Sequence, residues 1–133
     1  MKQESKEKIM RNKDTGKFFI RYVKSFMHAV DGFIYAVKYE HNMIIMILAT
    51  IVVVIAGLIY SISTAEWLFC IGIIGAVIAS EMINTAIEAI VDLVSPEKHE
   101  LSKIAKDTAS TASLVLSITA FIGALIIFLP KIF

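Results

Sequence analysis

Three long apolar runs, separated by short polar segments, dominate the chain. They cover residues 43–62, 67–94 and 111–128, and the first and third contain no charged side chain. A helix needs roughly 20 mostly apolar residues to cross a bilayer. The third run is followed by Pro130, which favours a helix end there. We therefore predict an all-α integral membrane protein with three membrane-spanning helices.

The composition supports this prediction. Hydrophobic residues make up 57% of the 133 positions and the mean hydropathy is +0.75, whereas soluble domains are usually about 45–50% apolar. The length allows one domain, residues 1–133. The single cysteine, Cys70, lies within an apolar run, which excludes a disulfide framework or a cysteine metal site within one chain.

A different pattern precedes the first run. Over residues 18–37, aromatic and branched apolar side chains recur at helical spacing, while basic and polar side chains take the other face. This pattern is typical of a helix that lies in the membrane interface, although a surface helix with no role beyond anchoring explains it as well. Residues 1–14 are charged and lack periodicity, and we predict a mobile arm there.

Basic residues are distributed unevenly among the segments that connect the runs. Nine of the 13 Lys and Arg residues precede position 40, three lie in 95–107, none lies in 61–66, and one follows the third run. Positively charged segments stay in the cytoplasm. We therefore predict a multi-pass cell-membrane protein with a cytoplasmic N-terminus and an external C-terminus. Ser63 is the expected N-cap of the second span.

The second run carries four polar side chains, Glu81, Asn84, Glu88 and Asp92. Their spacing of three, four and four residues places them in one stripe of a helix. A charged side chain in a span costs on the order of 3 kcal/mol on insertion scales and by default indicates function. Each residue also has an explanation without a functional role. Glu81 would then be a structural carboxylate paired with a neighbour, Asn84 would link helices through its amide, and Asp92 would be solvated.

Two other polar groups are expected at a similar depth, namely Glu40 before the first span and Lys106-Asp107 before the third. Carboxylates gathered without a balancing lysine repel one another unless a cation holds them, and oxygen ligands suit Mg²⁺. This set favours phosphoryl transfer from a soluble nucleotide to a lipid hydroxyl. No GxxxxGK[ST] motif is present. A small non-enzymatic transporter or proton relay remains the alternative of another class.

The stretch EMINTAIEAIVD at 81–92, followed by HEL at 99–101 and AKD at 105–107, resembles the prokaryotic diacylglycerol kinase family, and Gly32, Ala36, Glu40 and Asn42 fit the same pattern. The resemblance covers about residues 18–130. The pair Glu66-Trp67, the spelling NTAIE and the ending IIFLPK are similar to the Gram-positive branch, whose members are undecaprenol kinases. The segment STAS at 110–113 departs from the Gram-negative enzymes and bears on lipid choice.

The resemblance implies a homotrimer with active sites shared between subunits, ATP and a membrane lipid alcohol as substrates, and no nucleic-acid partner. It implies that Glu81 is the catalytic base, that Glu40 and Glu88 hold Mg²⁺ on the ATP phosphates, and that Asn84 orients base and phosphate and contacts the substrate. The implied nucleotide-binding residues are Asn84, Glu40, Glu88, Asp92, His99, Glu100, Lys106, Asp107, Arg21 and Lys24.

We therefore expect an ATP-dependent kinase that phosphorylates undecaprenol at the cytoplasmic membrane surface, with diacylglycerol as the alternative substrate. The general base lies where a lipid hydroxyl reaches it, so it does not discriminate between lipids. Discrimination is expected from an apolar groove formed by Phe26, Val30, Phe33 and the isoleucines of the first span.

Overall fold

The computed structural model describes residues 2–97 and 99–133, with side chains from residue 17 onward. Within these ranges the chain is helical: α1 (Lys2–Tyr39), α2 (His41–Ile59), α3 (Thr64–Val94) and α4 (Glu100–Ile132). The all-α prediction is confirmed. The chain divides after Tyr35 into two compact units, which are described separately.

The first unit contains most of α1, a continuous helix that includes the predicted interfacial segment 18–37. Phe19 and Phe26 are both largely exposed on it. The position of this helix in the membrane interface stays a prediction, as does the mobility of residues 1–14. The helix ends because Glu40 has an extended backbone, with φ −105° and ψ 111°, and this residue forms the N-cap of α2.

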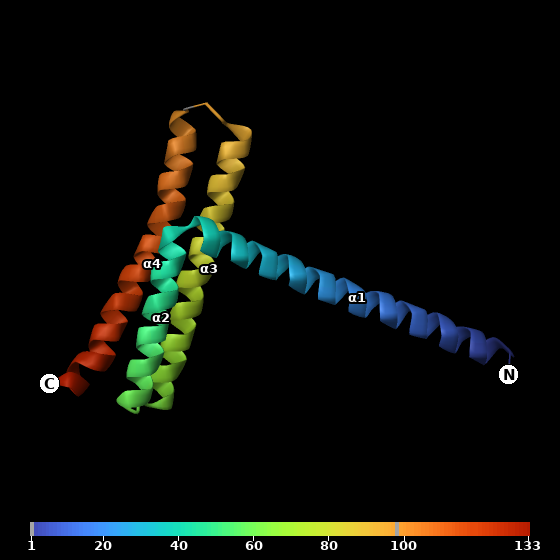
Figure 1. Cartoon of the computed structure of the whole chain (residues 1–133), viewed down its shortest axis with the longest axis horizontal. Coiled ribbons are helices and arrows are strands. Elements are labelled where there is room, and N and C mark those ends of the chain that lie inside the picture. The colour runs from blue at the N-terminus through green and yellow to red at the C-terminus, as the bar shows by residue number, and fades with distance from the viewer. Residues whose placement is uncertain (1, 98) are drawn as a thin grey trace. The chain divides into compact units, whose positions relative to one another are not determined.

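In the second unit α2, α3 and α4 run side by side, and α3 is antiparallel to both neighbours (Figure 1). All three are long and apolar enough to cross a membrane, as predicted. Helix α4 begins eleven residues before the predicted span, at Glu100, so most of the polar segment after residue 99 is helical rather than loop. The His99 imidazole explains this early start, because its Nδ1 accepts a hydrogen bond of 3.2 Å from Leu101 N.

The end of the bundle at which α2 passes into α3 is closed by caps and tight packing. Ser63 is the N-cap of α3, as predicted, and forms a capping box with Glu66, whose Oε2 accepts from Ser63 N at 2.6 Å. The Trp67 ring covers Gly57 so closely that a Cβ on Gly57 would lie 2.7 Å from it. Around these contacts lies an apolar cluster of Ile62, Cys70, Ile127 and Phe128.

Most large apolar side chains of α2, α3 and α4 face outward, and Leu93 is 82% exposed. This is the reverse of a soluble protein and suits helices surrounded by lipid tails. Among the residues whose side chains are described, the buried polar ones are Glu81, Asn84, Thr85 and Ser113. Polar groups therefore gather inside the second unit, where α3 faces its neighbours.

Candidate active site on helix α3

Glu81 is the most deeply buried charged side chain of the described residues, with 1% of its surface exposed. Its Oε1 oxygen has no hydrogen-bond partner there. One turn further on, the Thr85 hydroxyl donates a hydrogen bond of 3.0 Å to the backbone carbonyl oxygen of Glu81. This hydroxyl therefore pairs with the backbone of Glu81 and not with its carboxylate. A buried acceptor without a donor is costly, so the site is arranged for a group from outside this chain.

Asn84 and Glu88 follow on the same face of α3, as the spacing predicted. Asn84 is 4% exposed, and its Nδ2 donates to Glu88 Oε1 at 3.0 Å. This hydrogen bond fixes the amide orientation, so that Asn84 Oδ1 is left buried without a donor in the described part of the chain. The stripe therefore consists of two neighbouring buried acceptors, Glu81 Oε1 and Asn84 Oδ1, with Glu88 held beside them.

Glu40 joins this stripe from the start of α2. Its carboxylate makes no capping hydrogen bond to the helix that it begins. The pKa of Glu40 is raised, first by burial and then by the negative charges of Glu88 and Glu81, while His41 opposes the shift. Glu40 is thus close enough to both carboxylates to be repelled by them, as the sequence predicted.

The three carboxylates Glu40, Glu81 and Glu88 offer only oxygen ligands. Among the described residues there is no group of three or more His, Cys, Asp and Glu side chains placed to bind a metal ion. Two carboxylates are a normal protein contribution to Mg²⁺, whose other ligands are waters and substrate phosphates. Their mutual repulsion also favours a cation, so Glu40 and Glu88 fit a metal that arrives with a phosphate substrate.

A second group of charged residues lies between the C-terminal end of α3 and the N-terminal end of α4. Lys106 Nζ contacts Asp92 Oδ1 at 2.5 Å, and Lys103 Nζ contacts Asp107 Oδ2 at 2.6 Å. These pairs border a hollow of about 660 Å³ that polar side chains of both helices line. The predicted nucleotide residues Asp92, Lys106 and Asp107 are therefore brought together, and Lys103 adds a second cation beside them.

The other predicted nucleotide residues divide into two sets. His99 and Glu100 border the same hollow, although the His99 imidazole caps α4 and is partly committed to that role. Arg21 and Lys24 belong to the first unit, which is described separately from the second. Their contribution to the site stays a prediction.

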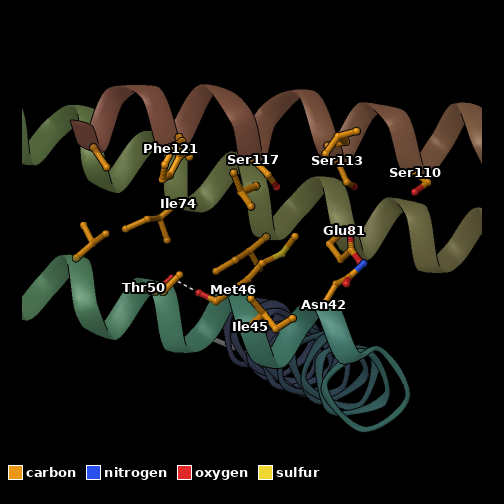
Figure 2. Close-up of a pocket in the computed structure, with 17 residues that line it drawn as sticks. Asn42, Ile45, Met46, Thr50, Ile74, Glu81, Ser110, Ser113, Ser117 and Phe121 are labelled. Carbon is orange, nitrogen blue, oxygen red and sulfur yellow. Dashed lines mark hydrogen bonds between the residues drawn. The ribbon is translucent and has the colours of Figure 1, made fainter. Parts of the chain in front are cut away.

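An apolar groove of about 530 Å³ runs between α2, α3 and α4 and ends at Glu81 (Figure 2). Glu81 and Asn42 lie at the same end of the groove, while Thr50 and Phe121 lie towards the other end. Ile45 is a first-span isoleucine that lines it. The described groove thus lies among the three spans, and the predicted contribution of Phe26, Val30 and Phe33 is untested because they belong to the first unit.

The α4 wall of this groove includes the segment 110–113, which the sequence linked to lipid choice, but none of its serines was predicted as a site residue. Ser110, Ser113 and Ser117 line it, and Ser113 is 4% exposed. Their spacing of three and four residues puts them on one face of an otherwise apolar helix. That spacing is the same signal that located the carboxylates on α3, and it was available in the sequence.

Comparison with known proteins supports the same interpretation. A family model described as "Prokaryotic diacylglycerol kinase" matches residues 27–128. An undecaprenol kinase of Bacillus subtilis is 37% identical over 123 residues, which cover 92% of this chain and all of the relative. A diacylglycerol kinase of Pseudomonas aeruginosa is 34% identical over 88 residues, or 66% of this chain and 72% of the relative. One of Escherichia coli K12 is 52% identical over 42 residues, which cover 32% and 34% of the two chains.

These relatives are kinases by name, and none is a transporter or a proton relay, so the alternative of another class has no support among them. The family match covers both the stripe on α3 and the charged pairs between α3 and α4. The predicted lipid kinase is confirmed at the level of the family. The chain belongs to the prokaryotic diacylglycerol kinase family.

Proposed function

We propose that this protein transfers the γ-phosphoryl group of ATP to the hydroxyl of undecaprenol at the cytoplasmic surface of the cell membrane. The observation that carries the proposal is Glu81, a buried carboxylate with an unpaired oxygen at the end of an apolar groove. An apolar groove suits the chain of a lipid, and a carboxylate at its end suits the single polar group of a lipid alcohol.

The reaction places Glu81 as the general base. The lipid hydroxyl gives its proton to a Glu81 carboxylate oxygen, and the hydroxyl oxygen forms the new bond to the γ-phosphorus. The bond between that phosphorus and the bridging oxygen of ATP breaks, and ADP leaves with the electron pair. A positioned base contributes roughly 10²–10⁴-fold to such a step. Asn84 holds Glu88 through its amide nitrogen, and its unpaired oxygen would be available to a substrate group.

Glu40 and Glu88 would hold Mg²⁺, which when bound neutralises the phosphate charges of ATP. The nucleotide itself would lie over the hollow between α3 and α4, where Asp92, Asp107 and Lys106 are gathered. His99, Glu100, Arg21 and Lys24 complete the proposed nucleotide contacts. The charged pairs support this placement. Lys106 is paired with Asp92, and a phosphate that takes the place of Asp92 would form a charge-assisted hydrogen bond with Lys106.

The choice of undecaprenol rests on the relative from Bacillus subtilis, which covers almost the whole chain and is named undecaprenol kinase. Diacylglycerol is the second candidate, because other relatives are named for it. The test compares kcat/KM for the two lipids with the same purified protein in the same bilayer. Undecaprenol should give the higher value, and a clear preference for diacylglycerol would reassign the substrate within the family.

The proposal includes a homotrimer with active sites shared between subunits, in which the basic N-terminal residues are cytoplasmic. Mixing two inactive variants tests the sharing, because complementary lesions in different subunits restore activity only where a site takes residues from both. Cysteine labelling tests the orientation: residues 61–66 should react from outside and residues 95–103 from inside. The reverse labelling pattern would contradict a cytoplasmic ATP site.

A further inference from the structure

The hydroxyl of Ser113 differs from five other hydroxyls on α2, α3 and α4. Five serine and threonine side chains donate to a carbonyl oxygen of their own helix at 2.7–3.0 Å: Thr50, Ser80, Thr85, Thr111 and Thr119. Ser113 Oγ is buried and has no hydrogen-bond partner in the part of the chain that the structure describes. A buried hydroxyl without a partner costs free energy, so a ligand that pairs with it gains by binding there.

Ser113 and Glu81 lie on facing helices at nearly the same height. The contact of Phe69 with Gly123 fixes the register of α3 against α4. Glu81 is twelve residues beyond Phe69 and Ser113 is ten residues before Gly123, which places them about 18 and 15 Å from that contact at 1.5 Å per residue. Both line the same groove, and Figure 2 shows Ser113 on α4 opposite Glu81 on α3.

The two unpaired atoms are chemically complementary to one ligand group. Glu81 Oε1 is an acceptor, and a serine hydroxyl has a proton to donate. An alcohol oxygen carries one proton and two lone pairs. It can therefore give its proton to Glu81, accept a hydrogen bond from Ser113 with one lone pair, and keep the other lone pair for the phosphorus.

We propose that Ser113 binds the hydroxyl of the acceptor lipid and turns its nucleophilic lone pair towards the nucleotide. This inference rests on the proposed function, because it assumes a lipid alcohol in the groove. The serine proton stays on Ser113 throughout, while the substrate proton moves to Glu81 as the oxygen–phosphorus bond forms and ADP departs. Ser113 is thus a positioning and substrate-binding residue, and Glu81 alone removes the proton.

The test is Ser113→Ala, measured as kcat and KM for undecaprenol and as KM for ATP. One neutral hydrogen bond contributes about 0.5–1.5 kcal/mol, so kcat/KM for the lipid should fall up to about tenfold. KM for ATP should stay unchanged, because Ser113 does not line the hollow proposed for the nucleotide. Ser113→Thr keeps the hydroxyl and should recover most of the lost kcat/KM.

Thr119→Ala is the matched control, since it removes a hydroxyl from the same helix that already donates to Val115 O. Thr119→Ala should leave kcat/KM for the lipid and KM for ATP unchanged. The inference is overturned if Ser113→Ala retains wild-type kcat/KM for the lipid, if it raises KM for ATP to the same extent, or if Thr119→Ala shows an equal loss. A wild-type protein that phosphorylates no lipid alcohol would overturn the proposed function and this inference together, which separates that failure from the others.

Discussion

Two of the three glutamates of helix α3, Glu66 and Glu81, have opposite surroundings. Glu66, near its start, is 26% exposed in its side chain and is fully engaged: Oε2 accepts from Ser63 N at 2.6 Å and Oε1 lies 3.2 Å from Lys131 Nζ. Glu81, four turns later, is 1% exposed and keeps an oxygen without a partner. The more buried carboxylate is the less satisfied one.

The same contrast extends to the regions around these two glutamates. Near Glu66 a capping box closes the start of α3, and an ion pair to α4 and the packing of Trp67 on Gly57 join the helices. Near Glu81 the unpaired atoms also include Asn84 Oδ1 and Ser113 Oγ. Because unpaired buried polar groups are destabilising, the first region holds the bundle together and the second gives up stability for binding. Substitutions should therefore affect stability at one end and catalysis at the other.

The largest effect should follow from Glu81→Gln, which preserves the shape of the side chain and removes the proton acceptor. Turnover of the lipid should fall by at least about 100-fold, given the size of general-base effects, while ATP still binds. Glu66→Gln is the matched control on the same helix and should keep near wild-type turnover. A Glu81→Gln enzyme with more than about a tenth of the wild-type rate would exclude the base role.

The next effect concerns the metal. Replacing Glu88 with Ala should raise the Mg²⁺ concentration needed for half-maximal activity by at least about 10–100-fold, the range seen when even an outer-shell partner of a metal ligand is lost. Glu40→Ala should act in the same direction. Glu66→Gln, at the far end of α3 from the stripe, provides the control. Mg²⁺ titrations that coincide for wild type and both stripe variants would remove these residues from the metal site.

Stability at the closed end should respond to Gly57→Ala. The new Cβ would lie 2.7 Å from the Trp67 ring, and such overpacking typically costs about 1–3 kcal/mol. The melting temperature should fall while kcat at a permissive temperature stays near wild type. Gly72→Ala meets no atom within 4 Å and should leave the melting temperature unchanged or slightly higher. Equal melting temperatures for the two variants would contradict tight packing there.

The smallest effect should come from Lys131→Met, which removes the partner of Glu66 at a partly exposed position. Ion pairs accessible to solvent contribute little, and the capping box remains. The melting temperature should fall by less than in Gly57→Ala, with no change in lipid turnover. A loss of turnover in Lys131→Met would break the division between a structural end and a catalytic end.

Much of this division was accessible from the sequence. Hydropathy predicted three span-capable helices, the helical spacing of Glu81, Asn84 and Glu88 predicted their common face, and Ser63 was predicted as a cap. These features depend on local repeats of 3.6 residues and on short-range hydrogen bonds. The start of α4 was misplaced because the polar composition of residues 100–107 obscured a helix that His99 caps.

The sequence by itself determined which helices form and which of their faces are polar, because both follow from spacing along one helix. Only the tertiary structure decided which polar atoms lack partners. Ser113 becomes notable because α3 and α4 meet in a register set by Phe69 against Gly123, which brings its hydroxyl opposite Glu81. Hydrogen-bond satisfaction between helices depends on that register, and no spacing within a single helix specifies it.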